Sequence, residues 1–584
     1  VGALLFTEGS ARQHAEAISY AQSISDVPVM ITFDGEWGVA MRVSDIPAFP
    51  RNMTLGAVRN DSLIYMYGQE TARQCRALGV HVNFAPVADV NSNPRNPVIG
   101  NRSFGEDPAN VARKVTAYSR GLEDGGVQSV AKHFPGHGDT DTDSHKALPT
   151  LDKSLDMLQG CEFVPFATYI DSGLSGIMVA HMDVPAVGGK GAVTSLSSKT
   201  YGMLRKKMGF RGLIYTDALG MKGAEAPDGT NNALAALRAG ADVLECANAT
   251  TDIDAIMTAL KKGKLKKSVI EDRCKRVLAY KYALGLTQRY TVDAGKALAA
   301  GNDARAMAMN RNLVAASMTC VFNHNGILPL KNLDSRSIAV VCIGAAAGNE
   351  FASYCRRYAG CDIFAAPNST LTSAQLREIK RHNTIILAVF NHSAAALATF
   401  RSLAEMPGTV GVFFNGPLRD AAFVGADTPL EAMIEAYENT PLAREYAAQA
   451  IFGGIKVNGM LPAEIPGVAK AGEGVILDKT RLGYTSPAAK GYSAWLTDSI
   501  DSICNDLVAR EGTPGMQVLV AKGGDVIVDA SYGTLTKGGA PVNFETMYDL
   551  ASVSKALGTL PGIMIAVDSG YIDVEKPIST YIPG

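Results

Sequence analysis

One short segment of this chain carries the residue types best suited to acid–base chemistry. Between Lys132 and His145 the sequence reads KHFPGHGDTDTDSH, with three histidines, three aspartates and one lysine in fourteen residues. The apolar run 126–131 precedes it, and Pro135 and Gly136 disfavour a helix. A strand that ends in a loop crowded with ionisable groups is how an α/β enzyme presents catalytic residues.

Three interpretations of this segment follow from its residue types. It could be a solvated polar loop without chemistry. His133 and His137 are four residues apart, which brings two metal ligands together on a helix, but the Pro-Gly break argues against a helix, so we expect no metal and no other cofactor. In the third interpretation Asp143 reaches one ring nitrogen of His145, which fixes the tautomer and raises the basicity of the other nitrogen.

The same residues carry a family resemblance. KHFPGHGDT followed by DSH resembles the signature of glycoside hydrolase family 3, in its β-N-acetylhexosaminidase branch. Three more segments agree with that family in chain order, and each follows an apolar stretch: FDGE at 33–36, NRSFGEDP at 101–108 and YTDALGM at 215–221. Any one of them alone is a weak signal, whereas the four in order are specific.

The resemblance implies how a glycosidic bond would be cleaved. Asp217 would be the nucleophile, and His145, held by Asp143, would be the acid and base in place of a second carboxylate. An imidazole with an ordinary pKa near ~6.5 can donate and then accept a proton close to neutrality. From the residues alone, Asp217 could instead be a helix N-cap.

Other charged residues near these segments suit sugar binding. Asp34 can accept hydrogen bonds from two hydroxyls at the non-reducing end. Donors to hydroxyls and to an acetamido carbonyl are expected from Arg42, Arg102, Lys132 and His133. Alternatively, Arg42 is a surface helix charge and Arg102 pairs with Glu106 or Asp107. Trp37 stands where the family often has glycine and could either form a stacking wall or simply pack.

The elements that must position these residues alternate along residues 1–290. Apolar stretches predict strands at 2–6, 28–33, 80–87, 127–132, 175–180, 212–216 and 241–246. Helical patterns lie at 61–78, 108–124, 154–172, 230–239 and 261–286. This alternation predicts parallel strands with crossover helices. Seven strands favour an α/β fold of the TIM-type (β/α)8 barrel that lacks its first unit, with the motifs at the C-terminal ends of strands.

A second α/β region is expected over 305–475. Strands are predicted at 338–343, 384–390 and 409–414, with a helix at 373–381. The pattern favours an open three-layer sandwich of largely structural role, and the stretches 436–440, 452–454 and 461–462 resemble the second domain of the same family. No Gly-rich phosphate fingerprint accompanies these strands. Residues 469–491 are interpreted as a linker.

The third region, 490–584, is predicted to begin with a helix at 494–511. Two β-runs follow, at 516–521 and 525–528, joined by the Gly-Gly turn of a hairpin. Ser552 and Lys555 then form an S-x-x-K pattern, which places both side chains on one helix face, where the lysine can activate the hydroxyl. Exposed Ser/Lys pairs are also common without function.

This third region resembles the start of an α+β serine β-lactamase or penicillin-binding-protein domain. The resemblance rests on TPG at 513–515, the hairpin and YDLAS at 548–552. The later motifs of that family are not in the sequence, so we expect a truncated domain whose second site, Ser552 with Lys555, is incomplete.

Composition excludes some classes of function. The chain has 584 residues, 47% of them hydrophobic, and a net charge of −2, which favours several domains with ample cores and no nucleic-acid partner. No apolar run approaches the ~20 residues of a membrane span. Nine cysteines without CxxC spacing are interpreted as core residues. Both ends look cut, so a targeting signal would lie upstream; an extracytoplasmic location, periplasmic or in the cell envelope, is favoured over a cytoplasmic one.

The leading hypothesis is a retaining exo-β-N-acetylglucosaminidase acting on N-acetylglucosaminyl–muramic acid fragments of bacterial peptidoglycan. A β-glucosidase or β-xylosidase of the same family is the nearest alternative, although those enzymes typically lack the DSH element. A histidine base does not repel an anion, so an N-acetylglucosaminide phosphorylase is a further alternative. The remaining ones are a serine β-lactamase or esterase with an accessory barrel, and a non-catalytic sugar-binding scaffold.

Overall fold

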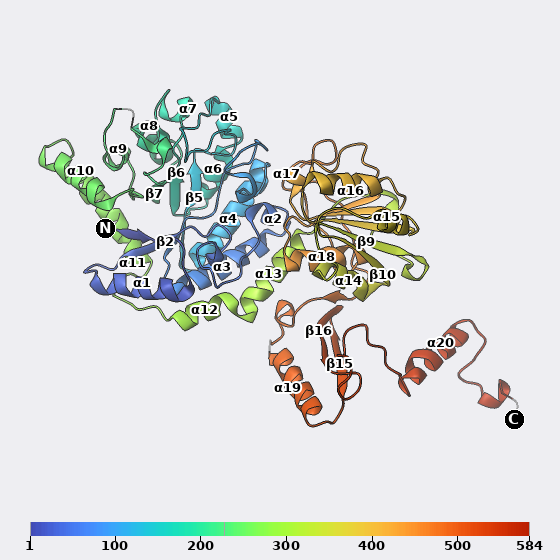
Figure 1. Cartoon of the computed structure of the whole chain (residues 1–584). Helices are drawn as coiled ribbons and strands as arrows, with labels where there is room; N and C mark the ends of the chain where they lie inside the picture. Colours follow the sequence, from blue (N-terminus) through green and yellow to red (C-terminus); the bar gives the residue numbers. More distant parts are fainter. Residues whose placement is uncertain (1, 227, 494, 583–584) are drawn as a thin grey trace. The chain divides into compact units, whose positions relative to one another are not determined.

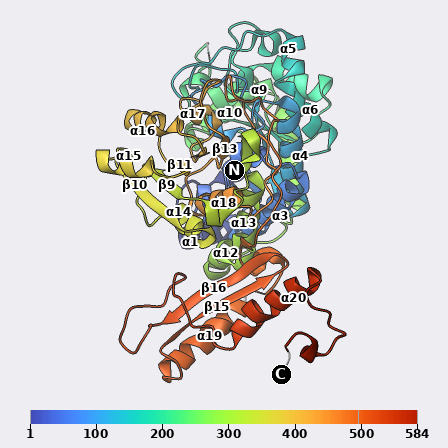
Figure 2. The same cartoon turned by 90° about the vertical axis from the view of Figure 1, so that its right-hand side faces the viewer.

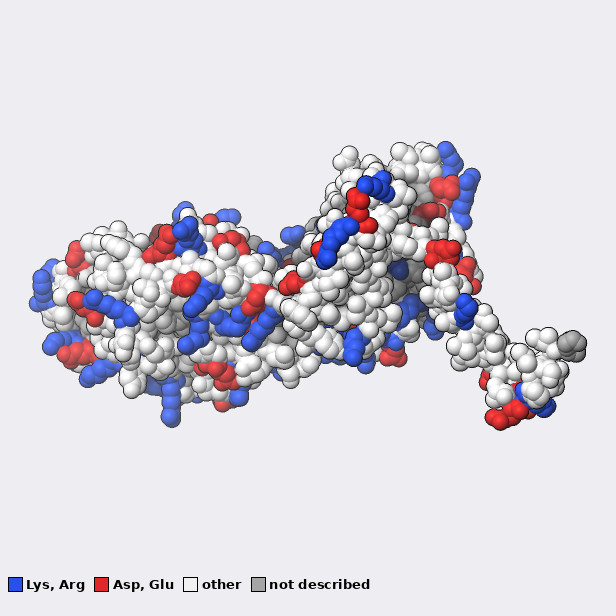
Figure 3. Space-filling view, turned by 90° about the horizontal axis from the view of Figure 1, so that it is seen from below, with Lys and Arg blue, Asp and Glu red and all other residues white. Residues whose placement is uncertain are grey.

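The computed structural model describes residues 2–226, 228–493 and 495–582, which form two compact units. The first unit runs to Leu496 and includes 521–527; the second comprises 497–520 and the chain from 528 onward. Basic and acidic side chains lie among one another over most of the face shown in Figure 3. Among the helices described, none is both long and apolar enough to cross a membrane.

The first half of unit 1 is built on parallel strands (Figure 1). One sheet has the order β1 (Ala3–Leu5), β2 (Met30–Phe33), β3 (Val82–Asn83) and β4 (Gln128–Ser129). Another has β5 (Ala131–Phe134), β6 (Gly176–Val179) and β7 (Leu213–Thr216). Only Val130 separates β4 from β5, and parallel bridges Val87–Lys132 and Tyr215–Val243 extend the pairing. The prediction of parallel strands is therefore confirmed, while closure into an eight-stranded barrel stays a prediction.

The strand positions differ from the sequence prediction in one way that affects the site. The predicted strand 127–132 ends at Lys132, whereas β5 continues through His133 to Phe134. All four residues of β5 are buried, and the strand tolerates its two polar side chains because each has a buried carboxylate partner, Glu36 for Lys132 and Asp89 for His133. Asp34 and Asp217 directly follow β2 and β7, as expected.

Local capping explains which helices were predicted well. Helices α3 (Asp61–Leu78) and α4 (Pro108–Asp124) have the predicted bounds. The Asn60 side chain accepts a hydrogen bond from the N–H of Ser62, and α3 ends at Gly79 in the left-handed conformation. Asp107 caps α4 ahead of a proline at its first position.

Two predicted helices are wrong in extent. The helix expected at 154–172 is two helices, α5 (Leu155–Gly160) and α6 (Phe163–Asp171), because the chain leaves helical geometry at Cys161 and buried Glu162 pairs with Lys153 at 2.6 Å. The helix expected at 261–286 is α11 (Lys267–Ala283), separated from α10 (Ala249–Lys261) by Gly263 with φ +66°. The expected helix at 230–239 is α9 (Asn232–Ala239).

The second half of unit 1 is a six-stranded sheet with helices on both faces (Figures 1 and 2). The strand order is β10 (Cys361–Ala366), β9 (Ile338–Ile343), β11 (Thr384–Val389), β12 (Thr409–Phe413), β13 (Ala432–Glu435) and β8 (Thr319–Asn323); only β8 is antiparallel. One core lies against α14 (Glu350–Tyr358) and α18 (Pro441–Phe452), the other against α15 (Ser373–Ile379) and α16 (Ala394–Ala404). The layers are therefore helix, sheet, helix.

The segment predicted to be a linker, 469–491, packs on this sheet region, so that prediction is wrong. Val475 forms an antiparallel bridge with Cys320, and Leu477, which is buried, forms one with Val457. The Arg481 guanidinium donates to two backbone carbonyls. Composition does not report such long-range backbone partners, so a Gly/Ala/Lys-rich stretch predicts a linker even where the chain is packed. Strand β14 (Gly483–Tyr484) then pairs in parallel with residues 525–526.

The last elements follow the predicted order. They are α19 (Trp495–Ala509), β15 (Gly515–Lys522), its neighbour β16 (Asp525–Gly533) and α20 (Leu560–Asp568). Gly523 and Gly524 both have positive φ, as the tight hairpin turn requires. The Lys555 ammonium donates to the Ser552 hydroxyl at 3.0 Å, and both residues are exposed.

Candidate active site

The predicted site residues of the first region gather around one cavity of ≈ 310 Å³ at the C-terminal ends of the parallel strands. Its lining includes Asp34, Glu36, Arg42, Arg102, Lys132, His133, His137, His145, Asp217 and Glu245. Asp143 does not line the cavity but contacts His145. Chain segments far apart in sequence thus meet where parallel α/β sheets bind ligands.

Lys132 joins two carboxylates at one side of the cavity. Its ammonium lies 2.6 Å from Oδ1 of Asp34 and 2.9 Å from Oε1 of Glu36. Burial lowers the pKa of Lys132, but the two carboxylates outweigh that effect and the pKa is raised. Burial likewise raises and Lys132 lowers the pKa of Asp34, with a net lowering. All three groups are therefore charged at neutral pH. Arg42 holds the other oxygen of Asp34 at 2.8 Å, so the surface-charge interpretation of Arg42 does not apply.

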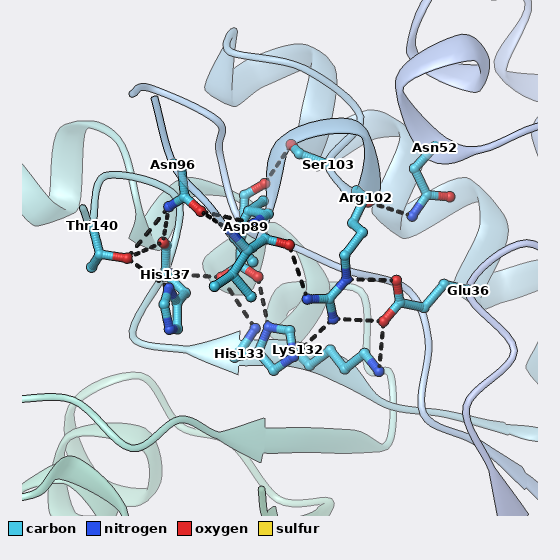
Figure 4. A network of polar contacts seen from close by, with 12 residues as sticks. Glu36, Asn52, Asp89, Asn96, Arg102, Ser103, Lys132, His133, His137 and Thr140 are labelled. Carbon is cyan, nitrogen blue, oxygen red and sulfur yellow. Dashed lines mark hydrogen bonds and ion pairs between the residues drawn. The ribbon is translucent and has the colours of Figure 1, made fainter. Parts of the chain in front are cut away.

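Arg102 forms a two-pronged ion pair with Glu36 (Figure 4). Its Nη2 and Nε atoms lie 2.7 and 2.9 Å from the two carboxylate oxygens. Glu36 is buried, which raises its pKa, but Lys132 and Arg102 hold that pKa well below its usual range. The pairing of Arg102 with Glu106 or Asp107 is therefore wrong: Asp107 caps α4, and Glu36, 66 residues away, takes the guanidinium.

A buried aspartate orients His133. Asp89 Oδ2 lies 2.7 Å from Nδ1 of His133, and Asp89 Oδ1 accepts the backbone N–H groups of His133 and His137 (Figure 4). A carboxylate partner makes Nδ1 the donor in the neutral ring, so Nε2 is the acceptor. Arg102 lies 3.5 Å from that Nε2 atom. The sequence prediction missed Asp89, although an acid two residues after the predicted strand 80–87 was the available signal.

His137 lies beside His133 but has different partners. Its Nδ1 atom is 2.8 Å from the Thr140 hydroxyl, and its buried Nε2 atom has no partner in the part of the chain described. Burial lowers the pKa of His137, so its ring is neutral at neutral pH. Among the described residues, no group of three or more His, Cys, Asp or Glu side chains is arranged to hold a metal ion.

Asp217 directly follows β7 and lines the cavity. Its Oδ1 atom accepts the N–H of Ala218 at 2.8 Å. Burial raises the pKa of Asp217, but the His133 and His181 rings and that N–H give a net lowering. His181 is fixed by the Ser195 hydroxyl at 2.6 Å and the Ala218 carbonyl at 3.0 Å. Asp217 is not a helix cap, since the next helical turn, Lys222–Ala224, begins after Met221.

His145 and Asp143 form the pair that their spacing predicted. Nδ1 of His145 lies 2.8 Å from Oδ1 of Asp143, which also accepts the backbone N–H of His145 at 3.0 Å. These two contacts lower the pKa of Asp143, so it is ionised at neutral pH. The His145 side chain is 64% exposed and borders the cavity, which leaves Nε2 free to exchange protons.

Trp37 lies outside the cavity lining, whereas Glu245 belongs to it. Trp37 packs against Arg51, whose guanidinium lies 4.3 Å from the ring centroid, and it does not line the cavity; this favours packing over a stacking wall. Glu245 does line the cavity and was not predicted to do so, although it falls in the predicted strand 241–246. Glu36, His137 and His181 were also not predicted as site residues.

The cavity combines an ionised carboxylate, a histidine supported by an aspartate, and a cluster of charged donors and acceptors. The carboxylate can attack an anomeric carbon, the histidine can protonate a leaving oxygen, and the charged cluster can bind sugar hydroxyls. With its parallel α/β scaffold, the site defines a glycoside hydrolase.

Comparisons with known proteins agree with this class. The model for the glycosyl hydrolase family 3 N-terminal domain matches residues 3–280, and the β-lactamase model matches 500–584. Beta-hexosaminidase LpqI of Mycobacterium tuberculosis is 35% identical over 267 residues, which are 44% of this chain and 68% of that protein. Beta-hexosaminidase A of Pseudoalteromonas piscicida is 37% identical over 247 residues, 38% of this chain but only 41% of that protein.

A solved structure has the same fold over most of the chain. The glycoside hydrolase family 3 β-N-acetylglucosaminidase from Paenibacillus sp. str. FPU-7 superposes with a TM-score of 0.65 and 28% identity, covering 80% of this chain and 93% of that one. This chain therefore belongs to glycosyl hydrolase family 3.

Proposed function

We propose that this chain is a retaining exo-β-N-acetylglucosaminidase, built on a (β/α)8 barrel, that removes terminal N-acetylglucosamine from peptidoglycan fragments. The observation that carries the proposal is that His145, bonded to Asp143, borders the same cavity as ionised Asp217. The relatives named as β-hexosaminidases and the Paenibacillus enzyme support the same sugar.

The reaction has two steps in this site. Asp217 attacks the anomeric carbon while the protonated Nε2 atom of His145 gives its proton to the departing oxygen, so an ester forms as the glycosidic bond breaks. Neutral His145 then takes a proton from water, which attacks the same carbon and releases Asp217. Asp143 holds the imidazole through Nδ1 and balances its positive charge.

The charged cluster would bind the terminal sugar. Asp34 offers carboxylate lone pairs to hydroxyls, while Arg42, Lys132 and His133 supply oriented donors or acceptors. Glu36 forms ion pairs with Arg102 and Lys132. The two cations are therefore already positioned before the sugar binds.

The proposed substrate is a fragment of the bacterial cell wall. It is supported by the β-lactamase model at 500–584 and by the Ser552–Lys555 contact, because serine enzymes of that type act on cell-wall peptides or their mimics. A substrate in the wall also favours a location outside the cytoplasm, which cell fractionation would test.

Substrate comparison tests the activity. We expect kcat/KM on an aryl β-N-acetylglucosaminide to exceed that on the matched aryl β-glucoside, and proton NMR of the first product to show the β-anomer. The reverse preference would assign a β-glucosidase. The reaction should be run in phosphate and in a non-phosphate buffer: free N-acetylglucosamine in both means hydrolysis, whereas a sugar 1-phosphate means phosphorolysis.

A further inference from the structure

Glu245 lines the cavity with an acidic side chain that has no protein partner in the described part of the chain. Among the described residues, none donates a hydrogen bond to its carboxyl and none forms an ion pair with it. Every other carboxyl group that lines the cavity has at least one: Asp34 and Glu36 have cations, and Asp217 has the Ala218 N–H. Glu245 is half-buried in the cavity lining, and a bound ligand would complete the hydrogen bonding of its carboxyl.

The backbone fixes Glu245 beside the proposed nucleophile. Tyr215 and Val243 form a parallel bridge, and Asp217 and Glu245 each lie two residues further on. Because side chains alternate along extended chains, both carboxyls belong to the same face, on neighbouring segments ~4.8 Å apart. The N–H of Glu245 is bonded to the Thr216 hydroxyl at 3.0 Å, and its carbonyl accepts the N–H of Leu219 at 3.0 Å, so Glu245 is held in place.

The charges around Glu245 favour its neutral form. Burial is the largest influence, the carboxylates of Asp217 and Asp34 add to it, and Lys132 and Arg42 oppose it; the pKa of Glu245 is raised to about 8. The adjacent Cys246 thiol has its pKa raised to about 11 by burial and does not ionise in this range. Two neighbouring carboxyls are thus held in opposite states, Asp217 ionised and Glu245 protonated.

We propose that Glu245 is a substrate-binding residue that donates a hydrogen bond, as a neutral carboxylic acid, to an oxygen atom of the terminal sugar bound beside Asp217. The proposal rests on the proposed function and deepens it. Asp34 and Asp217 are ionised and can only accept hydrogen bonds, so a protonated Glu245 supplies a donor on their side of the subsite.

Loss of the Glu245 proton should weaken sugar binding. When Glu245 ionises it can no longer donate, and the sugar oxygen then faces a negative charge. Only enzyme with protonated Glu245 binds well, so KM should rise about tenfold between pH 7 and pH 9 as the competent fraction falls. Ionisation of His145 acts on proton transfer, and therefore mainly on kcat, which separates the two effects.

The test compares the variants Glu245→Gln and Glu245→Leu in the full chain, with Glu271→Gln as the matched control. Glu271 is a surface residue of α11 that pairs with Lys267 outside the cavity. The substrate is an aryl β-N-acetylglucosaminide, with kcat and KM measured from pH 6.5 to 9.5. The amide of Glu245→Gln keeps a donor that does not titrate, so its KM should be flat; Glu245→Leu should raise KM roughly five- to tenfold at pH 7. The control should follow the wild type.

Binding of free N-acetylglucosamine, measured by calorimetry at pH 7 and pH 9, gives a second readout independent of turnover. We expect weaker binding at pH 9 for the wild type and equal binding for Glu245→Gln. If Glu245→Gln keeps the wild-type rise in KM, or if folded Glu245→Leu binds the sugar as tightly as the wild type at pH 7, the assignment of Glu245 is wrong. A wild type that neither binds this sugar nor cleaves any aryl hexosaminide would instead overturn the proposed function itself.

Discussion

The Oδ2 atom of Asp89 lies 2.7 Å from Nδ1 of His133, and both residues are buried. Through this contact a side chain that does not itself line the cavity decides which ring nitrogen of His133 can accept a hydrogen bond. The same carboxylate accepts two backbone N–H groups, so it also fixes the chain on either side of Phe134. Asp89 therefore acts as a positioning residue.

Replacing Asp89 with asparagine should reverse the tautomer of His133. An amide NH2 turned toward Nδ1 would donate to it, which moves the ring proton to Nε2 and converts an acceptor into a donor. We expect KM to rise about tenfold or more. Nitrogen NMR of the labelled His133 ring determines which ring nitrogen carries the proton. An unchanged Nδ1–H tautomer in Asp89→Asn would contradict this role.

Replacing Asp217 with asparagine should cost at least ~10³-fold in turnover, because the ester to the anomeric carbon can no longer form. The ionised state of Asp217, maintained by His133, His181 and the Ala218 N–H, is what makes it nucleophilic. A 2-fluoro sugar that traps the intermediate, followed by peptide mapping, identifies the attacked residue. Label on any side chain other than Asp217 would refute the assignment.

Replacing Asp143 with alanine should lower kcat by roughly 10²-fold and leave KM nearly unchanged, because Asp143 contacts His145 and not the cavity. A substrate with a very good leaving group, such as a dinitrophenyl glycoside, needs less help from an acid and should lose less activity. A change confined to KM would mean that Asp143 binds sugar.

The second α/β region holds two buried carboxyls whose titration should be visible in stability. Burial raises the pKa of Asp420 to about 7, and burial together with Asp420 raises that of Glu435. The folded state therefore holds more protons than the unfolded state above pH ~4, so the free energy of unfolding should fall as pH rises from 4 through 7, by a few kcal/mol at most.

Asp420→Asn removes one of these titrating groups. The melting temperature of this variant should drop less between pH 5 and pH 8 than that of the wild type. Glu405→Gln, which changes an exposed carboxyl after α16, is the matched control and should keep the wild-type dependence. Equal pH dependence in all three proteins would show that the carboxyl pair is ionised in the folded state.

The sequence alone determined features that depend on neighbours along the chain. Helices α3 and α4 have the predicted bounds, and Asn60, Gly79 and Asp107 supply the local caps that fix their ends. The contact of Asp143 with His145 was predicted because two residues of separation allow it. The order of strands and the resemblance at four segments were enough to indicate the family.

The tertiary structure decided the partners of the buried charges. Arg102 pairs with Glu36 from 66 residues away, whereas the sequence suggested Glu106 or Asp107 as its partner. Asp89 reaches His133 across 44 residues. Glu245 became a site residue because the bridge between Tyr215 and Val243 sets it beside Asp217. Periodicity and composition report which residues a chain buries. Strand order and register decide which buried polar groups meet, and that choice sets their protonation states.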